Sequence, residues 1–551
     1  MTIIASIYPG PHDANICILQ DGEILINLEL ERFSRVKKDG GFTLEFFHHC
    51  LDNCGIGPND IDVFVIDGQY FNYYKSDLPK LFTEYDGVPI GDFEKLKSSL
   101  SYQGSVVFNG RRLPFISIQH HLAHAASAFY TSPFENASII TADAGGTGVN
   151  FSISLGKDGQ IIPLRNWWRW TAALGYWWSK IPYYYGVKEP GTLMAISAYG
   201  KHNPALRAEL LSQIITTAKQ PLNDHFIHID RKFDENSGVP LKPLDPKING
   251  DADLAYALQS ITDEIFAGWF AQASKLTGNK NICFSGGLAL NCIGNTRAVQ
   301  LSNSGTLHVP PNANDSGLAM GAALAVYYGT PGNIYKPKYF NPYQGAFHND
   351  SIVNSAIEQA CKRHQLKRLK VNDIAESVSS ILENRKIICR YKGRSEAGPR
   401  ALGNRSFLAA PDIPNLRKTM NKVKKREWYR PFAPIVLGSK KDEIFDTSVE
   451  NSYYMNTSSV VREKWRKSLE GVLHSDNTTR PQIVDNQTDQ ELYQIVNNFY
   501  DKTSIPAILN TSFNINEPLV EKPDEAINTF IAAGKDVEYM QIENEILQKA
   551  N

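Results

Sequence analysis

Two histidines and two aspartates have the side-chain types and the spacing to hold a metal ion. His120 and His124 are four residues apart in an alanine-rich segment. A helix there would place both imidazoles on one face, because about 3.6 residues make one turn. Asp143 and Asp315 each lie in a glycine-containing turn, and two imidazoles with two carboxylates suit a divalent metal such as iron, zinc or manganese. His121 would lie about 100° further round the helix, so we leave it out of the ligand set.

A repeated strand pattern is expected to position these side chains. Residues 3–30 and 137–167 each contain a strand, a turn with an acidic residue and glycine, a second strand, an Asp-Gly turn and a third strand. Asp-Gly between alternating strands indicates a tight hairpin. In actin-like ATPase folds a duplicated unit of this kind holds a nucleotide between two similar halves. Chance similarity between two hairpin sheets is the alternative.

Strand, turn and helix then alternate between residues 251 and 330. A helix is predicted over 251–276, and a strand over 281–284 leads through Ser285-Gly-Gly287 into a second helix. A strand over 306–309 leads into the turn that carries Asp315 and a helix over 318–328. Turns of this kind direct backbone N–H groups toward an anion or a phosphate, so the pattern favours a nucleotide-type cleft.

The C-terminal part concentrates basic chemistry. A proline-containing stretch over 329–344 connects it to the first domain. The second domain, residues 345–551, carries arginines beside glycine, proline and aromatic residues rather than along a polar helix face. Guanidinium groups suit phosphate oxygens and glycines allow close approach, so we expect an anion site. A solvated basic face is the alternative.

The overall composition is that of an intracellular enzyme. Over 551 residues, 57 lysines and arginines balance 58 acidic residues, which argues against a nucleic-acid partner. Seven cysteines without a Cys-x-x-Cys pair indicate reduced thiols. The N-terminus lacks the pattern of a signal peptide, and no stretch approaches the roughly 20 apolar residues of a membrane span. We therefore expect a cytoplasmic protein of two or more domains, with no membrane partner.

Taken together, the motifs resemble the O-carbamoyltransferases of natural-product and nodulation-factor biosynthesis. These enzymes are relatives of the tRNA threonylcarbamoyladenosine-forming enzymes. The matching segments follow the order of the family over nearly the whole chain: His120–Phe129, Gly286–Asn291, Asn314–Gly317, Gly393–Gly403, Arg426–Pro434 and Asn510–Asn514.

The resemblance implies an α/β protein of two domains. Residues 1–335 would form a duplicated actin-like (ASKHA) domain that holds the metal and transfers the carbamoyl group. Residues 345–551 would form a smaller YrdC-like α/β domain that makes carbamoyl-adenylate from carbamoyl phosphate and ATP, with Mg²⁺, and releases pyrophosphate. The acceptor would be a hydroxyl, or else an amine, of a small molecule. Members often dimerise through the N-terminal domain, so a homodimer is a further expectation.

The resemblance also assigns roles to residues. His120, His124, Asp143 and Asp315 would bind iron(II) or another divalent metal. The remaining sites match family motifs: Arg394, Lys424, Arg430, Arg480 and Asn510 for carbamoyl phosphate and adenylate, Gly286, Gly287 and Asn291 for the nucleotide, and His12 for the base near the acceptor. An imidazole with a pKa near neutrality can take a hydroxyl proton. His12 capping its own turn is the alternative.

Two positions depart from the family pattern. Thr192 stands where members commonly carry lysine, which removes a positive charge near the expected nucleotide cleft, and Lys38 stands where histidine is common. Five of the eight tryptophans fall between Trp167 and Trp178, and they would either line an acceptor pocket or pack in a core. A tRNA-modifying threonylcarbamoyl transferase and a non-catalytic nucleotide-binding regulator remain as alternative functions. Balanced charge argues against the first, and intact ligand sets argue against the second.

Overall fold

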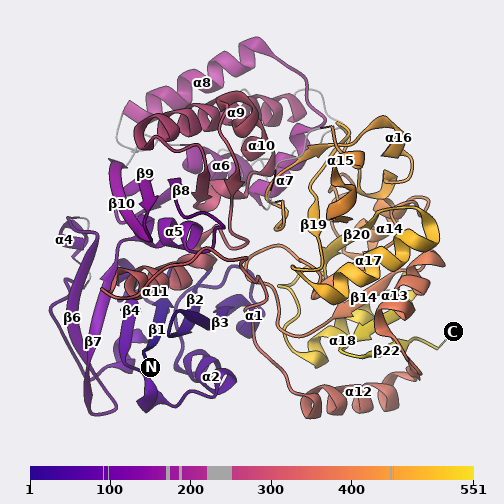
Figure 1. Ribbon diagram of the computed structural model, residues 1–551, viewed down its shortest axis with the longest axis horizontal. Helices are drawn as coiled ribbons and strands as arrows, with labels where there is room; N and C mark the ends of the chain where they lie inside the picture. Colours follow the sequence, from indigo (N-terminus) through magenta and orange to yellow (C-terminus); the bar gives the residue numbers. More distant parts are fainter. Residues whose placement is uncertain are drawn as a thin grey trace, which may run out of the picture.

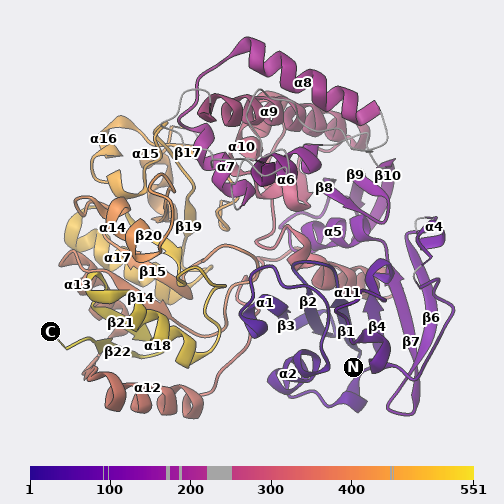
Figure 2. The same ribbon diagram turned by 180° about the vertical axis from the view of Figure 1, so that it is seen from behind.

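Two similar α/β halves and a separate C-terminal domain make up the molecule. The computed structural model describes residues 1–90, 92–96, 98–168, 174–184, 189–219, 251–446, 450 and 452–550. Figure 1 shows the first half in indigo and purple, the second half in magenta above it, and the C-terminal domain in orange and yellow beside both. The view from behind in Figure 2 shows the same three bodies around a common centre.

The first half contains a seven-stranded sheet in the order β3-β2-β1-β4-β7-β6-β5. The strands are β1 (Ile3–Tyr8), β2 (Asn15–Gln20), β3 (Glu23–Glu29), β4 (Val63–Ile66), β5 (Glu84–Asp86), β6 (Ser101–Phe108) and β7 (Arg111–Ile118). β1 is antiparallel to β2 and parallel to β4. Helices α1 (Leu30–Ser34) and α2 (Leu44–Cys54) follow the first hairpins, and α3 (Leu78–Leu81) and α4 (Phe93–Leu96) lie between later strands.

The second half repeats this strand order. Its sheet runs β10-β9-β8-β11-β12, formed by β8 (Ala137–Gly146), β9 (Val149–Lys157), β10 (Gln160–Trp168), β11 (Ile282–Ser285) and β12 (Leu307–His308). As in the first half, two antiparallel hairpins precede the parallel strands. The duplication expected from residues 3–30 and 137–167 is present, and the protein has the predicted actin-like fold.

Two helices lie between the sheets and pack on each other. They are α5 (His120–Phe129) and α11 (Leu318–Gly329), seen near the centre of the two halves in Figure 1. At their crossing, a Cβ on Gly321 would lie 2.0 Å from the carbonyl oxygen of Ala123, so only glycine permits this approach. The helix expected around His120 and His124 is α5, and it begins directly at His120 because β7 continues to Ile118.

Helices on the outer side of the second sheet complete its core. They are α6 (Leu174–Tyr184), α7 (Pro190–Ser197), α8 (Pro204–Lys219), α9 (Asp251–Thr277) and α10 (Cys292–Ser302). Trp177 and Trp178 are buried in this core, and the Trp178 indole donates to Thr262 of α9. The core-packing alternative therefore describes these two residues, whereas Trp170 lies outside the described residues.

The C-terminal domain is built on an eight-stranded mixed sheet in the order β13-β22-β21-β14-β15-β20-β16-β19. Its strands are β13 (Lys367–Leu369), β14 (Ile388–Tyr391), β15 (Arg405–Ala409), β16 (Ala433–Leu437), β19 (Gln482–Val484), β20 (Ala507–Ser512), β21 (Tyr539–Ile542) and β22 (Glu545–Gln548). The helices are α12 (Asp350–His364), α13 (Ile374–Glu383), α14 (Leu416–Val423), α15 (Lys441–Ile444), α16 (Glu463–Arg466), α17 (Gln490–Thr503) and α18 (Pro523–Ala532), and β17 (Ser459–Val460) pairs with β18 (Thr478–Thr479). Its own hydrophobic core is drawn from residues 353–547.

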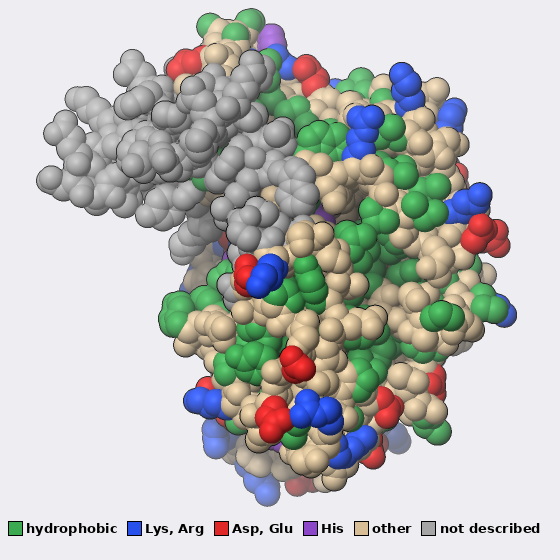
Figure 3. Space-filling view, turned by 90° about the vertical axis from the view of Figure 1, so that its left-hand side faces the viewer, with side chains coloured by type: hydrophobic (Ala, Val, Ile, Leu, Met, Phe, Trp, Pro, Cys, Tyr) green, Lys and Arg blue, Asp and Glu red, His purple; other side chains and the backbone are tan. Residues whose placement is uncertain are grey.

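The side of the molecule on which β6 and β10 lie in Figure 1 carries mixed charge. Figure 3 shows hydrophobic side chains down the middle of this face, with basic and acidic groups scattered over it. Over the described part of the chain, no helix combines the length and the hydrophobicity that a membrane crossing requires.

Candidate metal centre and arginine-rich pocket

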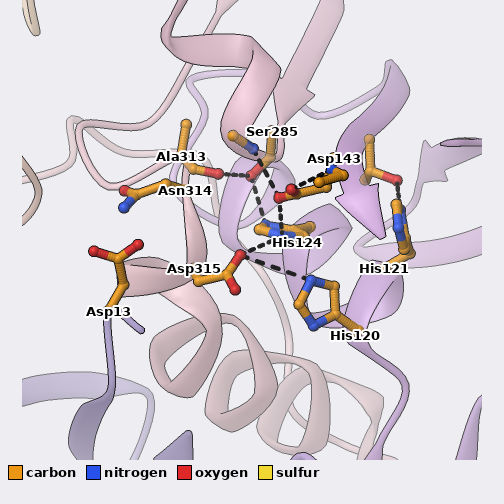
Figure 4. A network of polar contacts seen from close by, with 12 residues as sticks. Asp13, His120, His121, His124, Asp143, Ser285, Ala313, Asn314 and Asp315 are labelled. Atoms are coloured by element: carbon orange, nitrogen blue, oxygen red, sulfur yellow. Dashed lines mark hydrogen bonds and ion pairs between the residues drawn. The ribbon is translucent and has the colours of Figure 1, made fainter. Parts of the chain in front are cut away.

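The four predicted metal ligands come together at the junction of the two halves. α5 supplies His120 and His124, the end of β8 supplies Asp143, and the short 3-10 turn before α11 supplies Asp315. One ligand atom from each residue lies within 4.8 Å of the others. The Nε2 atom of His124 is 3.3 Å from Asp143 Oδ2 and 3.5 Å from Asp315 Oδ1, as Figure 4 shows.

The histidines present bare nitrogens to this cluster. The Nε2 atoms of His120 and His124 are buried and have no hydrogen-bond partner. Their Nδ1 atoms are engaged on the other side, at 3.2 Å from Asp67 Oδ2 and 3.3 Å from Ser285 Oγ. Such contacts fix the ring tautomer that leaves Nε2 free for a metal. Since buried polar atoms are normally satisfied, the two bare nitrogens fit a divalent cation.

Both carboxylates are held in place and kept ionised. Asp143 accepts the backbone N–H of Gly287 at 2.8 Å, and Asp315 accepts the Tyr8 hydroxyl at 2.6 Å. Burial alone would raise the pKa of both aspartates, but the facing imidazoles, above all His124 for Asp143 and His120 for Asp315, hold both pKa values below their ordinary range. Acceptor-only carboxylates are the form that binds a metal.

Two further histidines lie near the cluster, and one of them, His121, stays outside the ligand set as the sequence predicts. His121 points away from the cluster in Figure 4, with its ring nitrogens 2.6 Å from Thr141 Oγ1 and 2.9 Å from the Val149 carbonyl oxygen. His12 lies at the rim, with Nδ1 3.9 Å from Asp315 Oδ2. The hydrogen bond that the ring donates to the Asp13 carboxylate raises the pKa of His12 to about 9, so in this field the ring is protonated at neutral pH unless a cation offsets the carboxylates.

The Gly-Gly turn expected to contact a nucleotide instead supports the cluster and a helix start. Gly286, at φ +98°, packs so closely that a Cβ would lie 2.1 Å from the Ala142 carbonyl oxygen. Gly287 holds Asp143 as described. Asn291 caps α10 by accepting the Gly294 N–H at 2.9 Å and pairs with Gln259. A nucleotide role for these three residues stays a prediction.

A second site lies where α10 and α7 meet the C-terminal domain. Arg400, Arg426, Arg430 and Arg480 gather there. Burial and repulsion from Arg480 lower the pKa of Arg400 to about 9, and burial and repulsion from Arg430 lower the pKa of Arg426 to about 9. Buried cations that repel one another are stabilised when an anion binds among them, and we call this group of four the arginine pocket.

The N-terminal domain forms one wall of this pocket. Arg430 donates to the Thr192 hydroxyl of α7 and lies 3.6 Å from a carboxylate oxygen of Glu189. The Arg480 guanidinium lies beside the Cys292 thiol at the start of α10. Thr192, the position that departs from the family lysine, therefore serves as an acceptor for an arginine of the other domain.

The remaining predicted ligands of the C-terminal domain lie in different settings. Lys424 is buried and donates to Ser512 and to Asn514, at 2.7 Å from the Asn514 Oδ1 atom. Asn510 donates to the Ala401 carbonyl, one residue after Arg400. Arg394 lies apart from the four-arginine pocket and donates to the Gly345 carbonyl at 2.7 Å while resting over the Phe347 ring.

Several contributing residues were not singled out from the sequence. Asp67, which orients His120, and Tyr8, which holds Asp315, belong to no motif that we used, and Ser285, which orients His124, entered only as part of the Ser285-Gly-Gly287 turn. Arg400 and Arg426 lie inside the basic segments that predict an anion site, so their composition was informative, but nothing in it ranks them above Arg394.

Comparison with known proteins assigns the family. The sequence profile described as Carbamoyltransferase N-terminus matches residues 6–324, and the profile described as Carbamoyltransferase C-terminus matches residues 379–549. The nodulation protein NolNO of Sinorhizobium fredii is 30% identical over 95% of this chain and 77% of its own length. The nodulation protein NolO of Bradyrhizobium diazoefficiens is 31% identical over 76% of this chain and 77% of its own length.

Solved structures give weaker similarity. The activator of 2-hydroxyisocaproyl-CoA dehydratase from Clostridium difficile is 16% identical with a TM-score of 0.35, covering 59% of this chain and 94% of that one. HypF of T. kodakarensis is 14% identical with a TM-score of 0.33, covering 61% of this chain and 48% of that one. The fold assignment above therefore depends on the strand order of the two halves.

The two-half fold, the cluster between its halves and the matches over both domains define a transferase class. The chain belongs to the carbamoyltransferase family, and it is a carbamoyltransferase.

Proposed function

We propose that the protein is an ATP-dependent carbamoyltransferase that works in two halves. The C-terminal domain forms carbamoyl-adenylate from carbamoyl phosphate and ATP, and the N-terminal domain transfers the carbamoyl group to a hydroxyl of a small-molecule natural product. The observation that carries the proposal is the pairing of a four-residue metal-type cluster with a pocket of mutually repelling arginines.

The arginine pocket suits the adenylation step. Carbamoyl phosphate, ATP and one water give carbamoyl-adenylate, pyrophosphate and inorganic phosphate, so every leaving group carries phosphate charge. Arg400, Arg426, Arg430 and Arg480 can bind these oxygens in pairs. Fixed cations aimed at developing negative charge lower the barrier to phosphoryl chemistry.

The metal-type cluster suits the transfer step. A divalent cation such as iron(II), held by His120, His124, Asp143 and Asp315, supplies Lewis acidity toward a carbonyl or phosphate oxygen when bound. The acceptor hydroxyl forms a bond to the carbamoyl carbon as the bond to AMP breaks. His12, at the rim of the cluster, would receive the hydroxyl proton once a bound cation offsets the carboxylates and leaves its ring neutral.

The short separation of the two sites supports transfer within the protein. Gly287 holds Asp143 at one site, and Cys292 touches Arg480 at the other. Only the 3-10 turn Gly287–Leu290 and Asn291 lie between them, which is a span of about 10 Å at roughly 2 Å per residue. Carbamoyl-adenylate would hydrolyse in water, so two sites this close together favour its delivery within the protein.

Separate variants test the two halves without an acceptor. Pyrophosphate release from ATP should require carbamoyl phosphate and should fall by about 100-fold in Arg480→Ala, because one fixed cation of the pocket is lost. His124→Ala should lose bound metal, measured by elemental analysis after reconstitution, and should keep pyrophosphate release. His121→Gln is the matched control for the metal measurement.

Two outcomes would overturn the proposal. Pyrophosphate release that ignores carbamoyl phosphate would remove the adenylation half. Full metal content in His124→Ala would remove the metal centre. If neither outcome occurs, a screen of hydroxylated metabolites with labelled carbamoyl phosphate identifies the acceptor.

A further inference from the structure

A buried ion pair of the first half grips the arginine-bearing loop of the C-terminal domain. Glu29 ends β3 and Arg32 lies in α1, at 5% and 1% exposure. Arg32 Nε is 3.2 Å from Glu29 Oε2. The same pair binds both polar groups of one residue across the domain boundary, since Gly398 donates its N–H to Glu29 at 2.7 Å and accepts from Arg32 Nη2 at 2.8 Å.

The gripped residue also presses against the loop that carries a metal-type ligand. Gly398 has φ +86°, and a Cβ there would lie 2.3 Å from the Pro311 carbonyl oxygen and 2.9 Å from the Asn312 Cα. Asp315 follows three residues after Asn312 in the same loop. Gly398 is therefore held between Glu29 and Arg32 on one side and Pro311-Asn312 on the other, so this residue of the C-terminal domain contacts two separate segments of the N-terminal domain.

Gly398 also lies next to the arginine pocket along the chain. Arg400 is two residues after Gly398, and the peptide after it is fixed by Asn510, which donates to the Ala401 carbonyl at 3.0 Å. Glu396, two residues before Gly398, accepts the N–H groups of Leu402 and Asn404. The loop is thus held by bonds of its own, and the Gly398 peptide attaches it to Glu29 and Arg32 of the N-terminal domain, beside the weaker contact of Arg394 with Asn53.

We propose that Glu29 and Arg32 are positioning residues that set the arginine loop and the Asp315 loop in register through Gly398. This inference rests on the proposed function, since it assigns one buried pair the task of aligning the two sites. A burial cost is expected for any such pair, because a buried ion pair is rarely better for stability than apolar residues of similar size. A role in alignment accounts for the position of the Glu29–Arg32 pair. Among the contacts described above, Gly398 is where the arginine loop meets the Asp315 loop, and the pair binds that residue.

The test removes the contacts of Glu29 and Arg32 with Gly398 and measures substrate binding at the arginine pocket and metal binding at the cluster. Arg32→Met keeps length and removes both donors, and Glu29→Gln keeps an acceptor for Gly398 and removes the charge. In each variant we expect the KM for carbamoyl phosphate in the pyrophosphate-release assay to rise about tenfold, because a misplacement of about 1 Å can lower the rate by ten- to a hundredfold. We also expect weaker metal binding in equilibrium titration. Hydrogen exchange of a peptide containing Gly398 should accelerate.

The matched control is Arg35→Gln. Arg35 also joins α1 to the C-terminal domain, through the Leu519 carbonyl and Glu517, and it does not touch Gly398. It should lower the unfolding temperature and leave the KM and the metal affinity unchanged.

Distinct results overturn the inference and the function. If Arg32→Met and Glu29→Gln lower only the unfolding temperature, or if Arg35→Gln changes both sites equally, the pair has a purely structural role. If Arg32→Met does not fold, Glu29→Gln decides. If the unaltered protein releases no pyrophosphate, the proposed function fails, while metal titration and hydrogen exchange still test the grip.

Discussion

At the scale of single residues, the candidate metal centre depends on which imidazole nitrogen carries the proton. His120 and His124 turn Nε2 toward the carboxylates and Nδ1 toward Asp67 and Ser285. A hydrogen-bond acceptor at Nδ1 keeps the proton there and leaves a lone pair on Nε2. The residues behind the ligands therefore matter as much as the ligands.

Asp67→Asn should weaken metal binding by about 10- to 100-fold. The Asp67 Oδ1 atom already accepts the Gln69 N–H, at 3.0 Å, so an asparagine oxygen can keep that contact while its amide group faces His120. An amide donor there would place the ring proton on Nε2, the nitrogen that faces the cluster. Competition with a chelator measures the affinity.

Asp62→Asn is the control for this prediction. Asp62 lies in the same half and accepts the Ile3 N–H at 2.8 Å, away from the cluster, so the same change of residue type should leave the metal affinity as it is. Equal affinity in Asp67→Asn and the unaltered protein would contradict the role of Asp67.

At the scale of elements, the hairpins were predictable and the partners of the ligands were not. The Asp-Gly turns and alternating strands predict the hairpin formed by β2 and β3, because hairpin geometry is set locally. Asp67 is 53 residues from His120 along the chain, and only the parallel pairing of β4 with β7 brings the two regions together. No local pattern encodes that contact.

The same limit applies to the arginines. Arg394 and Arg400 lie in one glycine-rich segment with similar neighbours, so their composition cannot rank them. The left-handed turn at Gly398 and its docking on the N-terminal domain decide which of them faces Arg480. Docking of two domains is a long-range event that sequence periodicity does not report.

A buried histidine of β12 should make the N-terminal domain sensitive to acid. His308 is 3% exposed, and burial lowers its pKa from 6.5 to about 3. Above pH 6.5 the ring is neutral in both the folded and unfolded chains, so it has no effect on the pH dependence. As the pH falls from 6.5 toward 3, the unfolded chain binds the proton first and stability is lost, by up to about 1.4 kcal/mol per pH unit.

His308→Gln should therefore flatten the pH dependence of the unfolding free energy between pH 6.5 and 5, with some cost at pH 7 from the altered contact with Thr131. Denaturant titrations of chelator-treated protein at several pH values measure this dependence. His202→Gln, at an exposed position, should leave the curve unchanged. Parallel curves for His308→Gln and the unaltered protein would contradict the prediction.

At the scale of the whole molecule, the arginine pocket lies where the two domains meet. Thr192 and Cys292 come from the N-terminal domain, and Arg400, Arg430 and Arg480 come from the C-terminal domain. Without an anion these buried cations repel one another within the C-terminal domain. A bound anion would attract all of them and so stabilise the folded chain.

Inorganic pyrophosphate should therefore raise the unfolding temperature, with a free-energy gain of about 2.7 kcal/mol at 100 times its dissociation constant. Sodium chloride at matched ionic strength should not reproduce the shift, because screening weakens repulsion without bridging the arginines. Arg400→Gln should start from equal or higher stability, since one repelling charge is gone, and should lose most of the response. Arg394→Gln should keep the full response, because Arg394 contacts Gly345 and Phe347 outside the pocket. The reverse result, with Arg394→Gln unresponsive and Arg400→Gln unchanged, would show that the anion binds at the position expected from the motif alone and not where the two domains meet.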